Sequence, residues 1–159
     1  MKGKNKLKLH LICGFLGAGK TTYAKRLAKE VNGVVLNADE ECMKLFSKKE
    51  YEENWEECFS KTIDILWQRI NVLSELNQDI IFDLGFWSKA SRTDAKEKAM
   101  LMGIPSILHY VYAPDDILKK RLSLRKGIIA ENNLKEFKKL KQLFEIPKPD
   151  EYDIKIKNY

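Results

Sequence analysis

The segment that decides the interpretation of this chain is Gly14-Phe15-Leu16-Gly17-Ala18-Gly19-Lys20-Thr21. It has the spacing of a phosphate-binding loop, in which a glycine is followed after four residues by Gly-Lys-Thr. The glycines of such a loop allow backbone N–H groups to turn inward around phosphate oxygens, at the positive end of the following helix. An apolar run over residues 7–13 precedes the segment and a helical pattern follows from about Lys20, which is the context that this mechanism requires.

The residue types of the loop assign roles within it. We expect Lys20 to reach the outer phosphates of a nucleotide and the hydroxyl of Thr21 to ligate Mg²⁺. The rest of the predicted nucleotide-binding segment comprises Gly14, Phe15, Leu16, Gly17, Ala18, Gly19 and Thr22. The alternative interpretation is a glycine turn followed by an exposed lysine.

Short apolar runs and helical patterns alternate along the rest of the chain. Strands are expected at residues 34–36, 80–82, 107–112 and 154–156. Helices are expected from residue 39, over 51–77, over 88–102, from 114 and over 132–144. This alternation predicts an α/β fold, with a parallel sheet covered by helices on both faces.

Length and composition indicate one globular domain over residues 1–159. Hydrophobic residues make up 44% of the chain and charged residues 33%, with no apolar run long enough to span a membrane. Three isolated cysteines and no signal-peptide pattern predict a cytoplasmic protein with reduced thiols. The net charge of +6 suits a partner rich in phosphate, but it does not distinguish a nucleotide from a nucleic acid.

Two carboxylates follow predicted strands at the edge where a parallel sheet binds its ligands. Asp83 ends the strand at 80–82, where it can lie beside Mg²⁺ directly or through water; the alternative is a turn residue. Asp39 follows the strand at 34–36, where it can accept the proton of a substrate hydroxyl. The alternative for Asp39 is a helix N-cap, and the two roles can coexist.

Residues 119–126 contain five basic side chains and no acid. Arg121 and Arg125 are four residues apart, so on a helix both would project from one face and match the oxygens of transferring phosphates. The alternative is a solvated basic face. Arg92 is a weaker candidate for a substrate contact, and His10 and His109 are expected to be structural, without a recognisable partner.

The segments 34–40, 81–86, 110–114, 121–125 and 144–147 follow the loop in an order that resembles the small P-loop kinase-like proteins called AAA-domain predicted kinases. That group is similar to polynucleotide 5′-kinase, chloramphenicol phosphotransferase and zeta toxin kinases. The resemblance implies a three-layer P-loop NTPase fold with a five-stranded parallel sheet and a helical lid at about 119–131. It also implies ATP·Mg²⁺ as donor and a hydroxyl as acceptor, with Asp39 as base and Arg121 and Arg125 gripping phosphate.

The sequence departs from that group at one position, and it lacks the motifs of a second group with a similar loop. Many of the kinase-like proteins carry an arginine three residues after the acid, whereas this chain has Cys42, which weakens the case for a phosphorylated nucleic-acid end as substrate. The loop also resembles that of cobalamin-type metallochaperone GTPases. Their Gly-Cys-x-Cys-Cys and Asn-Lys-x-Asp motifs are absent from this sequence, which excludes that reading.

The function expected from the sequence is ATP-dependent phosphoryl transfer to a hydroxyl of a small molecule. One alternative is a kinase for the 5′ end of a polynucleotide, which the positive charge permits. Another, of a different class, is a nucleotide-binding regulatory or toxin-like NTPase module. No membrane partner is expected, and we expect a monomer or weak dimer.

Overall fold

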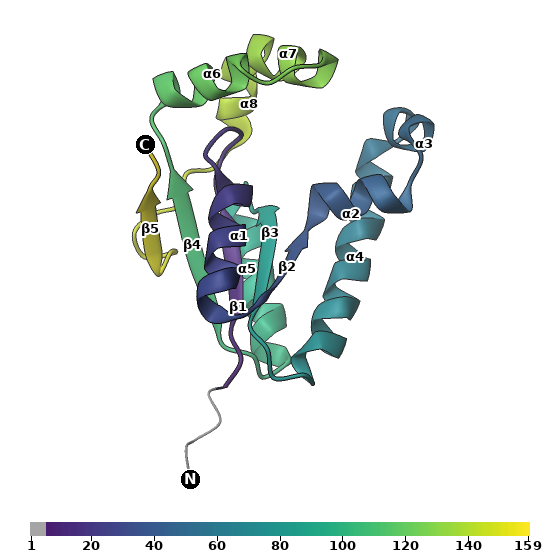
Figure 1. Ribbon diagram of the computed structural model, residues 1–159, viewed down its shortest axis with the longest axis vertical. Helices are drawn as coiled ribbons and strands as arrows, with labels where there is room; N and C mark the ends of the chain where they lie inside the picture. Colours follow the sequence, from purple (N-terminus) through teal and green to yellow (C-terminus); the bar gives the residue numbers. More distant parts are fainter. Residues whose placement is uncertain (1–5) are drawn as a thin grey trace.

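The computed structural model describes residues 6–159, which form one sheet of five parallel strands (Figure 1). In chain order the strands are β1 Leu9–Cys13, β2 Val34–Asn37, β3 Ile80–Gly85, β4 Ser106–Tyr112 and β5 Ile154–Lys157. Their order across the sheet is β2-β3-β1-β4-β5, so β1, which leads into the glycine-rich loop, lies at the centre. Parallel pairing at every step confirms the predicted α/β class and the five-stranded sheet.

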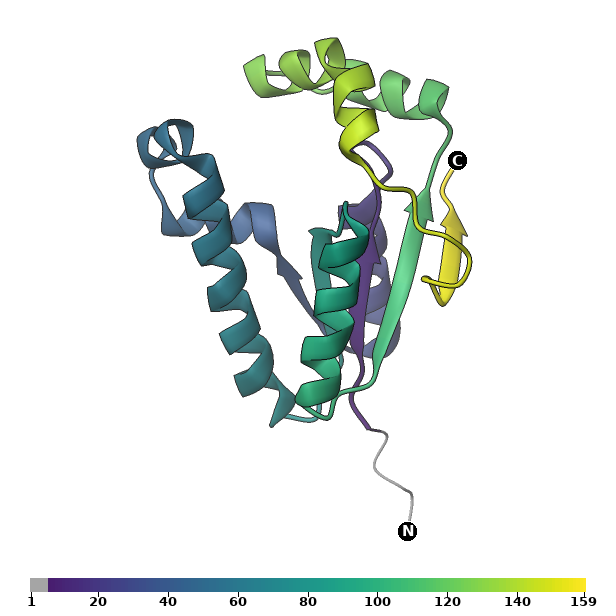
Figure 2. The same ribbon diagram turned by 180° about the vertical axis from the view of Figure 1, so that it is seen from behind.

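Helices cover both faces of the sheet. Within residues 6–159 they are α1 Lys20–Val31, α2 Ala38–Leu45, α3 Lys48–Glu53, α4 Trp55–Ser74, α5 Lys89–Leu101, α6 Asp115–Ser123, α7 Ile128–Lys135 and α8 Phe137–Leu143. Figures 1 and 2 show α1 on one face and α4 and α5 on the other. Because side chains alternate along a strand, Phe82 of β3 packs edge-on against Trp67 of α4, whereas its neighbour Ile81 lies against Gly33 after α1.

Short polar side chains set the ends of several helices. Asn32 ends α1 in the left-handed conformation, with φ at 52°. Asn37 begins α2, because its side chain accepts a hydrogen bond of 2.9 Å from the backbone N–H of Glu40. Ser88 begins α5 by accepting one of 3.0 Å from the N–H of Ser91, as the sequence predicts.

Two of the predicted helices are wrong in extent. The helix predicted over 51–77 is broken at Asn54, whose backbone lies at φ −153° and ψ 66°, and α4 ends at Ser74. The helix predicted over 132–144 begins earlier, at Ile128, and Glu136 separates α7 from α8. The apolar pattern continues across both interruptions, so hydrophobic periodicity does not reveal them.

Two arms extend beyond the carboxyl ends of the strands, and the second returns through α4 along one face of the sheet (Figure 1). Residues 115–143 form the α6–α8 arm, and residues 38–74 form the α2–α4 arm. The lid expected at about 119–131 falls in the α6–α8 arm, across the end of α6 and the start of α7. Gly127 begins α7 with φ at 109°, a backbone conformation that residues with a side chain rarely adopt.

The two histidines are partners, contrary to the sequence expectation. Nδ1 of His10 lies 2.9 Å from Nε2 of His109, and Nε2 of His10 lies 3.0 Å from a carboxylate oxygen of Asp79. Tyr23 completes the row, with its hydroxyl 2.8 Å from Nδ1 of His109. One arrangement of protons satisfies every contact: Tyr23 donates to His109, His109 donates to His10, and His10 donates to Asp79. This row ties α1 and β4 to β1 inside the fold.

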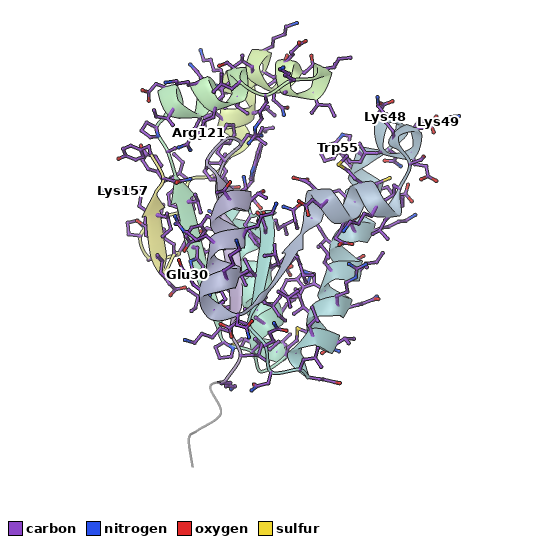
Figure 3. All side chains as sticks on the ribbon, in the orientation of Figure 1. Glu30, Lys48, Lys49, Trp55, Arg121 and Lys157 are labelled. Carbon is purple, nitrogen blue, oxygen red and sulfur yellow. The ribbon has the colours of Figure 1, made fainter. Side chains whose placement is uncertain are left out.

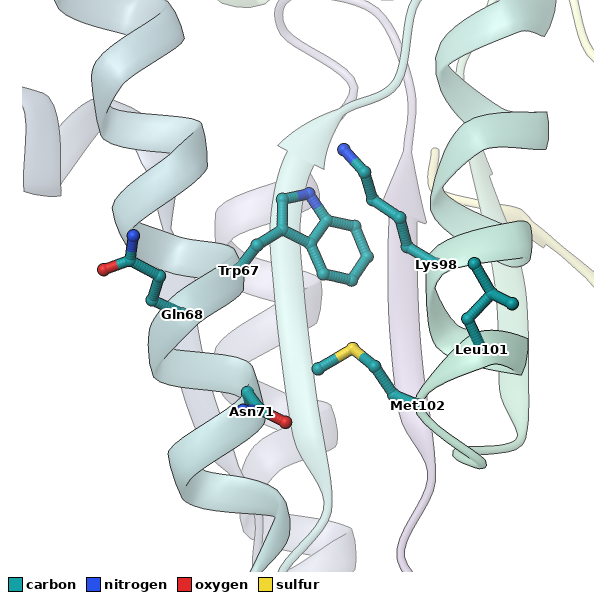
Figure 4. A pocket seen from close by; sticks show the side chains of 6 residues that line it. All are labelled: Trp67, Gln68, Asn71, Lys98, Leu101 and Met102. Carbon is teal, nitrogen blue, oxygen red and sulfur yellow. The ribbon is translucent and has the colours of Figure 1, made fainter.

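A groove of about 360 Å³ lies between α4 and α5 (Figure 4). Its walls are Trp67, Gln68, Asn71, Lys98, Leu101 and Met102. The ammonium of Lys98 lies 5.3 Å from the centre of the Trp67 ring, where the face of the indole attracts a cation. None of these residues belongs to the glycine-rich loop. No helix in residues 6–159 is both long and apolar enough to cross a membrane.

Candidate functional site

The backbone of the loop between β1 and α1 requires its glycines. Gly17 and Gly19 have φ values of 81° and 87°, in the left-handed region. Gly14 is needed for close approach, because a Cβ there would lie 2.7 Å from the carbonyl oxygen of Val111 on β4. A hydrogen bond of 3.1 Å from the N–H of Ala18 to the carbonyl of Phe15 closes the turn. The predicted phosphate-binding loop is thus a tight turn leading directly into the N-terminus of α1.

The side chain of Phe15 anchors the loop in the core. It is buried, with its ring centre 5.1 Å from that of Trp87 and 5.4 Å from that of Phe137 in α8. The ammonium of Lys141 lies 4.8 Å from the same ring centre. Phe15 therefore contributes its backbone to the loop, while its ring connects the loop to the α6–α8 arm.

Lys20, the first residue of α1, extends across the loop. Its Nζ donates a hydrogen bond of 3.0 Å to the carbonyl oxygen of Phe15. Burial lowers the pKa of Lys20, while the carboxylates of Asp83 and Asp39 act in the opposite direction. Lys20 thus lies in the electrostatic field of both predicted carboxylates, which favours its charged form.

Thr21 and Asp83, the two residues predicted to hold Mg²⁺, are in direct contact. The hydroxyl of Thr21 donates a hydrogen bond of 3.1 Å to Asp83, and the side-chain amide of Asn37 donates one of 2.7 Å to the same oxygen. Asp83 is buried, which raises its pKa, and the charge of Lys20 opposes that rise. A hydroxyl and a carboxylate are hard oxygen donors of the kind that Mg²⁺ prefers. The two residues therefore fit the chemistry of a Mg²⁺ site. Residues 6–159 hold no cluster of three or more His, Cys, Asp or Glu side chains that could bind a metal.

Asp39 lies in the first turn of α2, exposed beside this pair. The cap of α2 is Asn37, so the sequence alternative that Asp39 serves as the N-cap is wrong. Tyr51 of α3 lies close enough to Asp39 to feel its charge. Burial raises the pKa of the Tyr51 hydroxyl, and the negative charge of Asp39 raises it further. Within residues 6–159 the carboxylate of Asp39 makes no hydrogen bond or ion pair with another side chain, and it is exposed to solvent.

The two arginines lie in different surroundings. Arg121, in α6, donates a hydrogen bond of 3.1 Å to the carbonyl of Gly17 and another to the carbonyl of Asn158. Arg125 is exposed and lies beyond the end of α6, so the predicted shared helix face is wrong. The positive charge of Arg125 contributes to lowering the pKa of Lys20, which places it within electrostatic reach of the loop.

Arg92 is part of the interior rather than a substrate contact. Its side chain is 2% exposed. Its Nε donates a hydrogen bond of 3.0 Å to Glu151, and its Nη1 donates one of 2.9 Å to the carbonyl of Phe86. These bonds tie α5 to the segment before β5, which corrects the weak prediction of a substrate role.

Sequence reasoning missed two asparagines of the site. Asn37 both caps α2 and donates a hydrogen bond to Asp83. A signal for it exists in the sequence, because Asn37 ends a buried strand directly before a helix, where Asn is a favoured cap. Asn158 donates a hydrogen bond of 2.8 Å to the carbonyl of Ala18 in the loop. It comes 138 residues after Lys20, at the end of the chain, and no local pattern indicates that contact.

Solved structures of kinases share this fold. APS kinase of Mycobacterium tuberculosis, solved with AMPPNP and APS, superposes with a TM-score of 0.72 at 14% identity, over 96% of this chain and 88% of that one. A sugar kinase of Janibacter gives 0.70 at 19% identity, over 95% and 85% of the two chains. A gluconokinase of Sinorhizobium meliloti gives 0.70 at 9% identity, over 96% and 83%. No curated protein matches the chain.

A family model identifies the chain more directly than these structures do. The model described as an AAA domain matches residues 9–147, from the first residue of β1 to beyond the α6–α8 arm. That span includes the glycine-rich loop, Asp39, Asp83 and both arginines. The protein is therefore a member of this AAA domain family, with the fold of P-loop kinases.

Proposed function

We propose that the protein is an ATP-dependent phosphotransferase that moves the γ-phosphate of ATP·Mg²⁺ to a hydroxyl of a small molecule. The observation that carries the proposal is the meeting of three groups at the carboxyl ends of β1, β2 and β3. These are the loop with Lys20, the Thr21–Asp83 pair and the exposed carboxylate of Asp39. A binding module needs the first two groups, whereas a free carboxylate beside them suits proton transfer from an acceptor.

Each residue has one task in this account. The loop amides and Lys20 hold the phosphates and oppose their charge as the γ-phosphoryl group moves. Mg²⁺ held by Thr21 and Asp83 would neutralise phosphate charge. Asp39 accepts the proton of the acceptor hydroxyl, and Arg125 adds a positive charge from the α6–α8 arm.

The charge of the two arms supports an acceptor that is not an anion. The α6–α8 arm has nine Lys and Arg residues against four Asp and Glu, whereas the α2–α4 arm has five against nine. In the α2–α4 arm Arg69 is paired with Glu41, with 2.6 Å between Nη1 and a carboxylate oxygen, and Cys42 is buried and uncharged. A polyphosphate donor suits the first arm, and an uncharged or cationic hydroxyl compound suits the second.

Phosphate transfer from γ-labelled ATP tests the proposal. The acceptors are a panel of sugars, polyols, aminoglycoside-type compounds, nucleosides and RNA oligonucleotides with a free 5′ hydroxyl. Label in a small hydroxyl compound supports the proposal. Label in the oligonucleotides alone favours the polynucleotide kinase instead, and hydrolysis without transfer to any acceptor favours a regulatory NTPase.

A further inference from the structure

We infer that Asn158, the residue after β5, is a positioning residue of the nucleotide site that fixes the phosphate-binding loop from outside. The inference rests on the proposed function, because it assigns Asn158 to ATP binding. Asn158 is 138 residues from Lys20 in the chain, yet it contacts the loop directly. Figure 3 shows the neighbourhood, with Arg121 beside the loop and Lys157, the last residue of β5, on the same edge of the molecule.

Asn158 uses three of its polar groups to connect separate elements. Its side-chain amide donates a hydrogen bond of 2.8 Å to the carbonyl of Ala18. Its backbone N–H donates one of 2.9 Å to the carbonyl of Tyr112 at the end of β4. Its carbonyl accepts one from Arg121, which also donates to the carbonyl of Gly17. The loop, α6, β4 and the end of β5 are thereby joined around one residue.

The contact with Ala18 orients an amide that a phosphate needs. The peptide bond between Ala18 and Gly19 is trans and planar, so its N–H points away from its C=O. When Asn158 holds the carbonyl of Ala18 on the outer side, the N–H of Gly19 is directed to the opposite, inner side of the loop. Such inward amides are what hold phosphate at a loop of this kind.

The packing at Gly19 shows how closely Asn158 is fitted to the loop. A Cβ on Gly19 would lie 2.2 Å from Nδ2 of Asn158, well inside any real contact. Gly19 is therefore restricted twice, by its positive φ and by the amide of Asn158. Because Gly19 has no side chain, Asn158 can reach the carbonyl of Ala18. This fit indicates a specific contact rather than an incidental one.

Calorimetry with a non-hydrolysable ATP analogue and Mg²⁺ tests the role of Asn158. Asn158→Ala removes the donor, and Asn158→Leu removes it while keeping a side chain of similar size and adding no charge. We expect each to weaken binding about threefold to tenfold, the value of one hydrogen bond. Asn71→Ala is the matched control, because Asn71 is exposed on α4, away from the loop, and should leave binding unchanged.

Three further measurements distinguish a positioning role of Asn158 from a contribution to the stability of the fold alone. The KM for ATP should rise in both Asn158 variants, whereas the KM for the acceptor should not change. Arg121→Ala combined with Asn158→Ala should cost less than the product of the single losses, because the two residues hold the same loop. A lower unfolding midpoint with unchanged ATP affinity would overturn the inference. Failure of the wild-type protein to bind the analogue would instead overturn the proposed function, and the inference with it.

Discussion

The hydroxyl of Thr21 and the carboxylate of Asp83 are joined by a hydrogen bond of 3.1 Å, although 62 residues separate them in the chain. The bond links the start of α1 to β3 and places two oxygen donors beside the glycine-rich loop. Asn37, at the end of β2, holds the same carboxylate oxygen at 2.7 Å. The start of α1 and the two neighbouring strands β2 and β3 thus contribute to one corner of the site.

Thr21→Ala should separate metal-dependent from metal-independent binding. With Mg²⁺ present we expect ATP affinity to fall about tenfold, because one oxygen ligand is lost; with EDTA present, wild type and variant should bind alike. Calorimetry under the two conditions measures both values. Thr93→Ala, an exposed threonine on α5, is the control. An equal loss with and without Mg²⁺ would show that Thr21 contacts the nucleotide and not the metal.

Lys20→Met should weaken ATP binding by about tenfold to a hundredfold, the range for a charge-assisted hydrogen bond. The long apolar side chain retains most of the packing, so the change tests the ammonium itself. Lys25→Met, at an exposed position of the same helix, makes the same chemical change without an expected effect. Binding that survives in Lys20→Met at the affinity of the control would remove the nucleotide site from this loop.

Substitution of Arg121 and substitution of Arg125 should affect ATP affinity and turnover differently. Arg121 holds the backbone of the loop, so Arg121→Ala should lower ATP affinity as well as turnover. Arg125 is exposed and acts through its charge, so Arg125→Ala should lower kcat by about tenfold or more with ATP affinity within about threefold. Steady-state kinetics together with calorimetry measure the split, and Lys126→Ala controls for loss of a neighbouring charge. Identical losses for both arginines would contradict the assignment.

His109 should make the fold sensitive to mild acid. Burial, with a contribution from His10, lowers the pKa of His109 to about 4 from an ordinary value of 6.5, while Asp153 acts against it. The unfolded chain therefore binds more protons than the folded one between these pH values. The stability that neutral His109 provides is present above about pH 6.5 and is lost as the pH falls toward 4, by up to about 3 kcal/mol.

Urea denaturation of the wild type and of His109→Gln across that pH range checks this dependence. The glutamine amide can still hydrogen-bond to its neighbours His10 and Tyr23 but does not titrate. The variant should show a flatter dependence of the unfolding free energy on pH. Parallel curves would assign the acid sensitivity to other groups.

The sequence predicts the parts of the site that depend on one short segment. The loop, Lys20 and the order of strands and helices all follow from local spacing and from apolar runs of characteristic length. Asp83 is predictable because an acid directly follows the apolar run of residues 80–82 in β3. The Thr21–Asp83 contact then follows from the rule that parallel strands bring their carboxyl ends together.

The rest depends on contacts between distant segments. Arg92 has the position of a substrate residue, but Glu151 lies 59 residues away and neutralises it inside the fold. Arg121 and Arg125 have helical spacing, but α6 ends at Ser123. No sequence motif around Asn158 indicates its contact with the loop. In each case the deciding partner is set by tertiary packing, which a local pattern does not encode.

Phosphoryl transfer by Asp39→Asn tests the central claim most directly. Because Asn37 is the cap of α2, this substitution alters the proposed base without removing the start of the helix, and Asp39→Ala is a second variant of the same kind. Single-turnover transfer from γ-labelled ATP to the acceptor should fall by roughly 10²–10⁴, the usual contribution of a positioned base. ATP·Mg²⁺ affinity should stay within about threefold. A folded Asp39→Asn protein that transfers phosphate at the wild-type rate would contradict the account.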